Sequence, residues 1–255
     1  MGKLGNVILR VSLVALLLFA MGTCLAVRAS ADDIASSFLT GTNPSGNWTY
    51  GGLTAIGGVG LFTPFAFSCT NCYPTLPASS GQGYLVWGPA PPATGPLPIA
   101  FENNTAANET LGTVNLPLGW LNLHPSQNSF ADARFTATTA GTYVINGIFQ
   151  GDDIFGTTTD VHILSGTTDL FDAEVTGTGG PSQQAFNLTH TFAVGDTIDF
   201  AVGLGTDGSF FNDSTGLQGT FSLATVPTPE PSSLIMFSTG VLGLAAAAMR
   251  RKFFH

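Results

Sequence analysis

Several acidic residues of this 255-residue chain could take part in catalysis or bind a metal ion. Asp152 and Asp153 are adjacent, and glycoside hydrolysis requires two carboxylates about 5 to 10 Å apart across a cleft. In a strand these neighbours would face opposite sides, whereas in a loop both could face one site. The same two acids, with Asp207 and Asp213, could supply oxygen ligands to Ca²⁺. No Asp-x-Asp-x-Asp-Gly loop is present, so the sequence favours a solvated acidic rim, keeps calcium as an alternative and indicates no other cofactor.

Histidines are the second group with metal-binding chemistry. His124, His162 and His190 are too widely spaced to place metal ligands on one strand or helix. His190 falls on the apolar face of a predicted strand, which favours a core histidine with a hydrogen-bond partner. His124 precedes Pro125, so we expect an extended or turn conformation there.

Three tryptophans could bind a ligand by stacking. Trp48, Trp87 and Trp120 could each fill a core or, if they lie exposed on one sheet face, stack on sugar rings. Core filling is the expected use for most of the aromatic residues. Trp87 stands beside a proline-rich segment, and it is the one that we expect to be exposed.

The charges divide the chain into an acidic interior and two basic ends. All sixteen acidic residues lie between Asp32 and Glu230, where Arg134 is the one basic residue, so this interior has a formal charge of −15 within a total of −9. Binding to nucleic acid requires a basic face that can neutralise phosphates. The composition therefore excludes a nucleic-acid partner.

The N-terminal residues 1–31 have the three parts of a secretory signal peptide. Lys3 and Arg10 are positively charged, Val11 to Val27 is apolar, and small residues precede Asp32. We expect export. Two alternatives remain: an uncleaved anchor, because the apolar run is long for a signal, and a lipid attached to Cys24.

Cys69 and Cys72 are the cysteine pair that remains after export. In an oxidising compartment, this close pair is most simply a structural disulfide that closes a small loop. A redox pair would have to open a helix, and Tyr73-Pro74 argues against one. A zinc site would need two more ligands nearby.

The C-terminal residues 227–255 combine three features in a fixed order. A proline-rich spacer contains Pro229-Glu230-Pro231, an apolar segment at 233–249 follows, and Arg250, Arg251 and Lys252 end it. The prolines favour an extended spacer, the apolar segment is a predicted transmembrane helix that is short for a permanent span, and the basic end should stay cytoplasmic.

This tail resembles that of the PEP-CTERM family of exported proteins from Gram-negative bacteria. The resemblance implies delivery by the secretion machinery, a transient stay in the inner membrane, and processing near Pro229-Glu230-Pro231 by an exosortase, a membrane enzyme of the cysteine transpeptidase type. It also implies localisation at the cell surface or in the extracellular matrix, in association with exopolysaccharide and biofilm. An ordinary C-terminal anchor with a proline-rich stalk is the alternative.

The remaining residues, 32–226, are predicted to form one β-rich ectodomain. Glycine and threonine are abundant, and apolar residues alternate with polar ones in Phe186–Phe192 and Ile198–Leu204. Asp199 should then face outward. The proline-rich first half, with eight prolines between Pro64 and Pro98, reads as a long connection and not as a second domain. We therefore expect an all-β fold, a single antiparallel β-sandwich between the signal helix and the transmembrane helix.

The ectodomain also resembles a jelly-roll module that is frequent in exported bacterial proteins. The resemblance rests on segments spread over most of the domain: Asn43–Gly51, His124-Pro125, Arg134–Asp152, Val161–Gly166, Gly195–Phe200 and Asp213–Gly216. It implies a sandwich similar to carbohydrate-binding modules and assigns a role to no residue. The sequence thus predicts an exported, non-catalytic surface protein that binds neutral polysaccharide, with a two-carboxylate glycan hydrolase and a purely structural envelope protein as alternatives.

Overall fold

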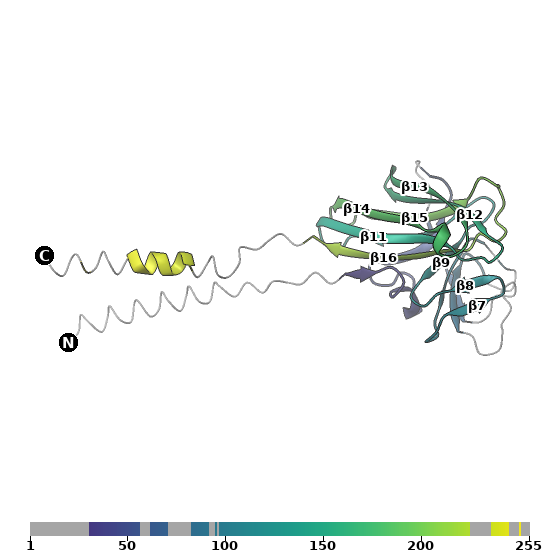
Figure 1. The fold of residues 1–255 in the computed structure, drawn as a ribbon, viewed down its shortest axis with the longest axis horizontal. Helices are drawn as coiled ribbons and strands as arrows, with labels where there is room; N and C mark the ends of the chain where they lie inside the picture. The colour runs from purple at the N-terminus through teal and green to yellow at the C-terminus, as the bar shows by residue number, and fades with distance from the viewer. Residues whose placement is uncertain are drawn as a thin grey trace. The chain divides into compact units, whose positions relative to one another are not determined.

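Short runs of β-branched and aromatic residues between glycines form strands over most of the chain's interior, because such side chains pack well on a pleated surface. The computed structural model describes residues 31–56, 62–70, 83–91, 95, 97–224, 236–244 and 250. The described residues from Ala31 to Ala224 belong to one compact unit. It is an all-β antiparallel sandwich of two sheets, as the sequence predicts (Figure 1).

The described part of the chain builds one sheet of eight strands and one of six, with a separate two-stranded hairpin. The eight-stranded sheet has the spatial order β14 (Gln184–Phe192), β11 (Gly141–Gly151), β16 (Thr215–Leu223), β9 (Leu121–His124), β6 (Ile99–Asn103), β5 (Tyr84–Gly88) and β4 (Phe67–Thr70), and β1 (Asp32–Asp33) pairs with β16. The six-stranded sheet has the order β13 (Thr168–Gly177), β12 (Thr157–Ser165), β15 (Thr197–Leu204), β10 (Phe130–Thr136), β2 (Trp48–Leu53) and β3 (Thr63–Pro64). The hairpin consists of β7 (Glu109–Leu111) and β8 (Val114–Leu116), and two short 3-10 helices, η1 (Phe38–Thr40) and η3 (Gly180–Ser182), lie in connections.

The core lies between the two sheets and is rich in aromatic rings. Trp48 lies fully buried at its centre, with ring-centroid distances of 5.3 Å to both Phe135 and Phe221. Phe186 and Phe192 are buried on the face that the alternation predicts, and His190, half-buried between them, contacts Phe192 and hydrogen-bonds Ser165. The predicted core face of β14 is therefore confirmed, including the partner of its histidine.

The outer face of the six-stranded sheet is partly covered, which the sequence does not predict. The face of β15 that carries Asp199 and Ala201 is buried as well as the core face. A second apolar cluster lies there, made of Leu53, Leu164 and Ala201, with Ile56, Phe62 and Phe130 packed against them. Asp199 faces outward as expected, but it is covered.

The proline-rich first half is not only a connection. Its segments β4 and β5 extend the eight-stranded sheet beyond β6, so this interpretation is wrong for 67–70 and 84–88. The error arose because the pairing of β5 with β6 joins residues on either side of the proline-rich loop, and the spacing of prolines carries no signal for such pairing.

The terminal segments are described only in part. Residues 236–244 are helical, and Arg250 is exposed. Among the described residues, no helix is long and apolar enough to span a membrane, so the predicted transmembrane segment is not identified here. The predicted signal peptide, Cys72, Pro229, Glu230, Pro231 and Arg251 lie outside the described residues.

Candidate functional site

A pocket of about 290 Å³ opens where loops from several strands meet at one end of the eight-stranded sheet. Its walls come from β6 and the segment before it, the turn between β7 and β8 with the start of β8, the end of β9, the residues after β11 and the loop between β15 and β16. The lining residues are Gly95, Leu97, Ile99, Phe101, Thr113, Val114, His124, Asp153, Phe210, Phe211, Asn212 and Ser214.

Two adjacent phenylalanines form the aromatic part of the wall. The rings of Phe210 and Phe211 are stacked, with centroids 4.5 Å apart and an interplanar angle of 26°. Phe211 is 69% exposed, although a side chain of this size is usually buried. The loop continues through Asn212, a residue in the left-handed region with a φ of 67°. The pair thus presents an exposed apolar platform at the pocket.

Asp153 is fixed in the pocket wall by three contacts. Its carboxylate accepts hydrogen bonds from the Thr113 hydroxyl at 2.7 Å and from the Phe155 backbone N–H at 2.9 Å. Its backbone forms a bridge with Val114 on β8. The β7–β8 hairpin and the loop after β11 therefore hold this acceptor rigidly, a condition for specific recognition.

His124 supplies a second acceptor. Its Nδ1 lies 2.9 Å from the backbone oxygen of Pro125, and because a carbonyl can only accept, Nδ1 carries the proton. Burial lowers the pKa of His124, so the ring is neutral at neutral pH. Nε2 is then left with a lone pair.

Asp152 does not share the pocket with Asp153. Asp152 is buried, and its two carboxylate oxygens accept hydrogen bonds from Gln150 at 2.9 Å and Asn122 at 2.8 Å. Burial raises its pKa to about 7, although both hydrogen bonds oppose the rise. The residues follow the end of β11 in a loop, yet their side chains diverge.

The four carboxylates considered for calcium are spread over separate environments. Asp213 is buried, accepts a hydrogen bond from the Thr158 backbone N–H, and has its pKa raised to about 7 mainly by burial. Asp207 accepts a bond from the Ser209 backbone N–H within the exposed part of the same loop. Within the described ranges, no three of these four lie with ligand atoms within 4.8 Å of one another. The calcium site stays a prediction without a formed cluster.

The C-terminal tail is identified by a match of its sequence to a family model. Residues 227–252 match the family model described as the PEP-CTERM protein-sorting motif. The chain carries a PEP-CTERM sorting motif. The resemblance seen at Pro229-Glu230-Pro231 is thereby confirmed, and the protein is a PEP-CTERM exported protein. The match covers the tail alone, so it says nothing about the activity of the sandwich.

The sandwich of this PEP-CTERM protein resembles several solved jelly rolls at low similarity. A carbohydrate-binding module described as CBM4 has 15% identity and a TM-score of 0.30, covering 63% of this chain and 96% of that one. A CBM51 module from Clostridium perfringens, solved with methyl-galactose, has 12% identity and a TM-score of 0.29, covering 60% and 99%. Rabbit GITRL has 16% identity and a TM-score of 0.25, covering 37% and 74%. No curated protein matches the sequence. TM-scores this low assign no ligand, so the sections below use the chain's own residues.

The tryptophans of the PEP-CTERM protein are not an exposed sugar platform. Trp48 and Trp87 are 0% and 7% exposed, so the expectation that Trp87 is exposed is wrong. Trp87 is on β5, a strand whose five residues are all buried because both faces of the strand are covered. Leu85 and Trp87 pack in the main core, and Tyr84 and Val86 pack in another cluster with residues of the β7–β8 hairpin. Trp120 is half-buried near Gly216.

The structure describes only one of the two cysteines in the predicted disulfide. Cys69 lies on β4 and is disulfide-bonded. Cys72 lies outside the described residues, so its pairing with Cys69 stays a prediction.

Sequence reasoning missed the residues that make the pocket aromatic. Phe210 and Phe211 stand in Gly205–Gly216, a segment rich in glycine and small polar residues that belongs to no strand up to Ser214. Two large apolar residues in such a loop have no strand face on which to be buried. This is the signal that could have indicated an exposed aromatic pair.

Proposed function

We propose that this PEP-CTERM protein is processed by an exosortase and then acts at the cell surface or in the extracellular matrix as a non-catalytic domain that binds neutral polysaccharide. The sorting motif supports the first part of this proposal. The pocket with its exposed Phe210–Phe211 pair supports the second.

The sorting step involves the secretion machinery, the inner membrane in transit and the exosortase. If it takes place, deletion of residues 229–255 should leave an unprocessed ectodomain in a different cell fraction from the wild type. Immunoblots of membrane, surface and medium fractions test this. The same size and location for both proteins would contradict exosortase sorting.

Aromatic stacking is the observation that carries the binding proposal. Sugar rings present C–H faces that pack on exposed aromatic rings, while their hydroxyls need hydrogen-bond partners. The pocket offers both, because Phe211 is exposed and Asp153, His124 and Thr113 lie in the same lining. Further apolar side chains on the neighbouring loops are exposed, namely Leu118, Ile154 and Phe155 at 49%, 52% and 74%. Exposed apolar side chains concentrated around a pocket are typical of a binding surface.

The charges favour a neutral ligand. The described residues of the pocket lining include a carboxylate and no lysine or arginine. Arg134, the one arginine between residues 32 and 226, is paired with Asp199 on the six-stranded sheet. A polyanion would meet an acidic surface without a free cation to neutralise it, whereas sugar hydroxyls can donate to Asp153 and His124.

The lining also favours binding over hydrolysis. Glycoside hydrolysis requires two carboxylates across the substrate, and Asp153 is the one acid among the described residues that line the pocket. Asp152, its neighbour, is engaged by Gln150 and Asn122 beneath the wall.

Retention on insoluble neutral polysaccharides tests the proposal. We expect the purified chain to be retarded, and Phe211→Ala to weaken its affinity about tenfold, the effect of losing about 1.4 kcal/mol of stacking. Phe67→Ala is the matched control, because Phe67 is a 42% exposed phenylalanine on β4 that does not line the pocket.

The alternatives give different results in the same assay. A purely structural protein would show no retention on any of the polysaccharides. A hydrolase would release new reducing ends, and Asp153→Asn would abolish that release without abolishing retention. Either result would overturn the proposed binding function.

A further inference from the structure

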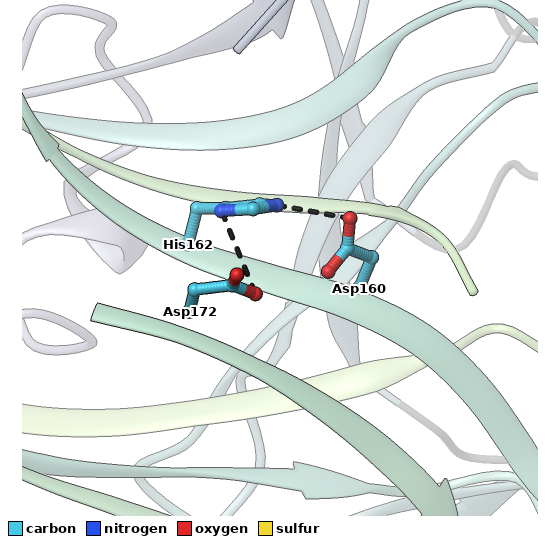
Figure 2. Close-up of side chains that lie close together, drawn as sticks. All are labelled: Asp160, His162 and Asp172. Carbon is cyan, nitrogen blue, oxygen red and sulfur yellow. Dashed lines mark hydrogen bonds and ion pairs between the residues drawn. The ribbon is translucent and has the colours of Figure 1, made fainter. Parts of the chain in front are cut away.

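Four polar side chains gather on the outer face of the β12–β13 hairpin, on residues that do not line the pocket. Asp160 and His162 are two residues apart on β12, so their side chains share a face. Asp172 is the cross-strand neighbour of His162 on β13. Figure 2 shows the imidazole of His162 between the carboxylates of Asp160 and Asp172.

A β-bulge brings the fourth side chain to this face. The register between β12 and β13 shifts after Ile163, so that Leu164 pairs with Asp169. The extra residue, Leu170, packs with Phe171 against the core between the sheets, although consecutive strand residues normally face opposite sides. Asp169 and Asp172 therefore both lie on the outer face beside His162. A regular strand would have placed Leu170 there instead of Asp169.

The imidazole is held firmly between its neighbours. Nδ1 of His162 lies 2.7 Å from a carboxylate oxygen of Asp169, and Nε2 lies 2.9 Å from one of Asp160. On its other side, the ring of Phe130 lies 6.1 Å away in an edge-to-face arrangement. The His162 side chain is consequently only 8% exposed. Such a ring has few orientations available.

This arrangement is electrostatically incomplete without a cation. A neutral imidazole has one N–H and one lone pair, yet both nitrogens of His162 face carboxylate oxygens. If Nδ1–H donates to Asp169, the Nε2 lone pair faces the oxygen of Asp160 with no positive charge between them. Metal-bound histidines have the same pattern, in which the second nitrogen donates its proton to a carboxylate that orients the ring.

We propose that Asp160, His162 and Asp172 bind one divalent first-row transition-metal ion, with Zn²⁺ as the best match, and that Asp169 orients the imidazole. Each of the three residues offers one ligand atom, and these atoms lie within 4.8 Å of one another. Zinc is bound by imidazole nitrogen and carboxylate oxygen at about 2.0–2.2 Å. The ion would bind Nε2, on the side of Asp160, because Nδ1 donates its proton to Asp169. Asp172 lies 4.0 Å from Nδ1, so its side chain, which is 69% exposed, would turn toward Nε2 to complete the site together with water.

The ligand set distinguishes this site from the calcium site considered for Asp152, Asp153, Asp207 and Asp213. Calcium and magnesium prefer oxygen ligands, whereas an imidazole nitrogen favours zinc and its neighbours. His124, His162 and His190 lie on three different strands, as their spacing in the sequence indicates. The proposed zinc site needs only His162. Asp-x-His on a strand, with a carboxylate opposite, is the signal that counting histidines misses.

Isothermal titration of the full-length chain in mild detergent, without a histidine tag, tests the proposal. With ZnCl₂ at pH 7.5 we expect one saturable site that a hundredfold excess of CaCl₂ does not displace. His162→Gln and Asp172→Asn should each weaken Zn²⁺ binding at least tenfold, and Asp169→Asn should weaken it by about 10- to 100-fold through the lost orientation of the ring. His190→Gln is the matched control, because His190 is a half-buried histidine hydrogen-bonded on another strand.

A second measurement does not depend on how the variants fold. In NMR spectra of the wild-type chain, added Co²⁺ should shift and broaden the imidazole signals of His162 more than those of His190. The proposal is wrong if Zn²⁺ binds no more tightly than Ca²⁺, if His162→Gln and His190→Gln bind it equally, or if Co²⁺ leaves the His162 signals unchanged. Such results would leave a proton on the imidazole as the cation of this cluster.

Discussion

The outer face of the six-stranded sheet carries two polar groups, one under an apolar cover and one open to solvent. The covered group consists of Asp132 and Arg134 on β10 and Asp199 on β15. The open group consists of Asp160, His162 and Asp172 on β12 and β13. In both groups, strand alternation turns charged side chains away from the core, and cross-strand pairing brings them together.

In the covered group, the arginine is held by partners within the protein. Arg134 makes two hydrogen bonds to Asp199, at 2.6 and 2.9 Å, and its guanidinium lies 4.0 Å from the centroid of the Phe62 ring. Asp132 is fully buried, and neither of its carboxylate oxygens receives a hydrogen bond of acceptable geometry from the described residues. Burial, and to a lesser extent the charge of Asp199, raises the pKa of Asp132 well above its usual value, although Arg134 opposes the rise.

The open group lies beyond the edge of that cover. Phe130 shields His162 on one side, but Asp160 and Asp172 are in contact with water. This comparison indicates that the apolar cover determines what a charged group on this face of the sheet does. Where Phe62 and its neighbours cover the sheet, the charged side chains are buried and pair within the protein, and where they do not, carboxylates stay open to solvent and to the proposed metal ion.

Removing the arginine should have the largest effect. Arg134→Ala leaves Asp199, whose side chain is 5% exposed, without its cation, so the free energy of unfolding at pH 7 should fall by about 3–5 kcal/mol. Urea unfolding followed by tryptophan fluorescence measures this. Asp172→Asn in the open group is the matched control, because this carboxylate is 69% exposed, and it should change the free energy of unfolding by less than about 0.5 kcal/mol without added metal. Equal losses of unfolding free energy in the two variants would show that the apolar cover does not make the covered group more important for stability than the open group.

The pH dependence of Asp132 should be the next largest effect. A raised pKa means that the folded protein retains this proton to a higher pH than the unfolded chain. Stability is therefore lost as the pH rises from the ordinary value of 3.8 through the raised value, at no more than about 1.4 kcal/mol per pH unit. Asp132→Asn, which cannot ionise, should therefore gain stability relative to wild type as the pH rises from 4 to 8.

Urea unfolding at several pH values gives this difference directly. Asp172→Asn is the control, because it makes the same substitution at a carboxylate that is 69% exposed. A flat difference for Asp132→Asn would mean that Asp132 ionises in the folded state as it does in water.

Displacing the cover should have the smallest effect. A Cβ added at Gly203 would lie 2.1 Å from the Phe130 ring, so Gly203→Ala must move Phe130 and should cost about 1–2 kcal/mol. It should also uncover His162, which Phe130 contacts. Gly180→Ala is the control, because its Cβ would meet nothing within 4 Å. Melting temperatures compare the two variants, and an equal loss would argue against close packing of Phe130 on Gly203.

The strand pattern and the sorting tail could be predicted from the sequence because both are local. The alternation in Phe186–Phe192 follows from the strand's period of two residues, and the PEP-CTERM motif is a continuous stretch. Even the pairing of Asp160 with His162 on one face is local. The predicted all-β sandwich required nothing more than these runs and the glycines between them.

The tertiary structure decided which faces are covered and which loops meet. Trp87 is buried because its face of β5 packs into the main core, Arg134 is covered because the Phe62 ring packs against its guanidinium, and Asp169 reaches His162 because a bulge changes the register of β13. The pocket joins Phe101, Thr113, Asp153 and Phe211, which are separated by up to 110 positions in the chain. Contacts over such separations depend on the packing of whole strands, whereas periodicity and motifs describe only neighbours in the chain. The sequence therefore determined the sorting motif and the strand faces of this protein, and strand packing alone decided which faces are covered and where the pocket lies.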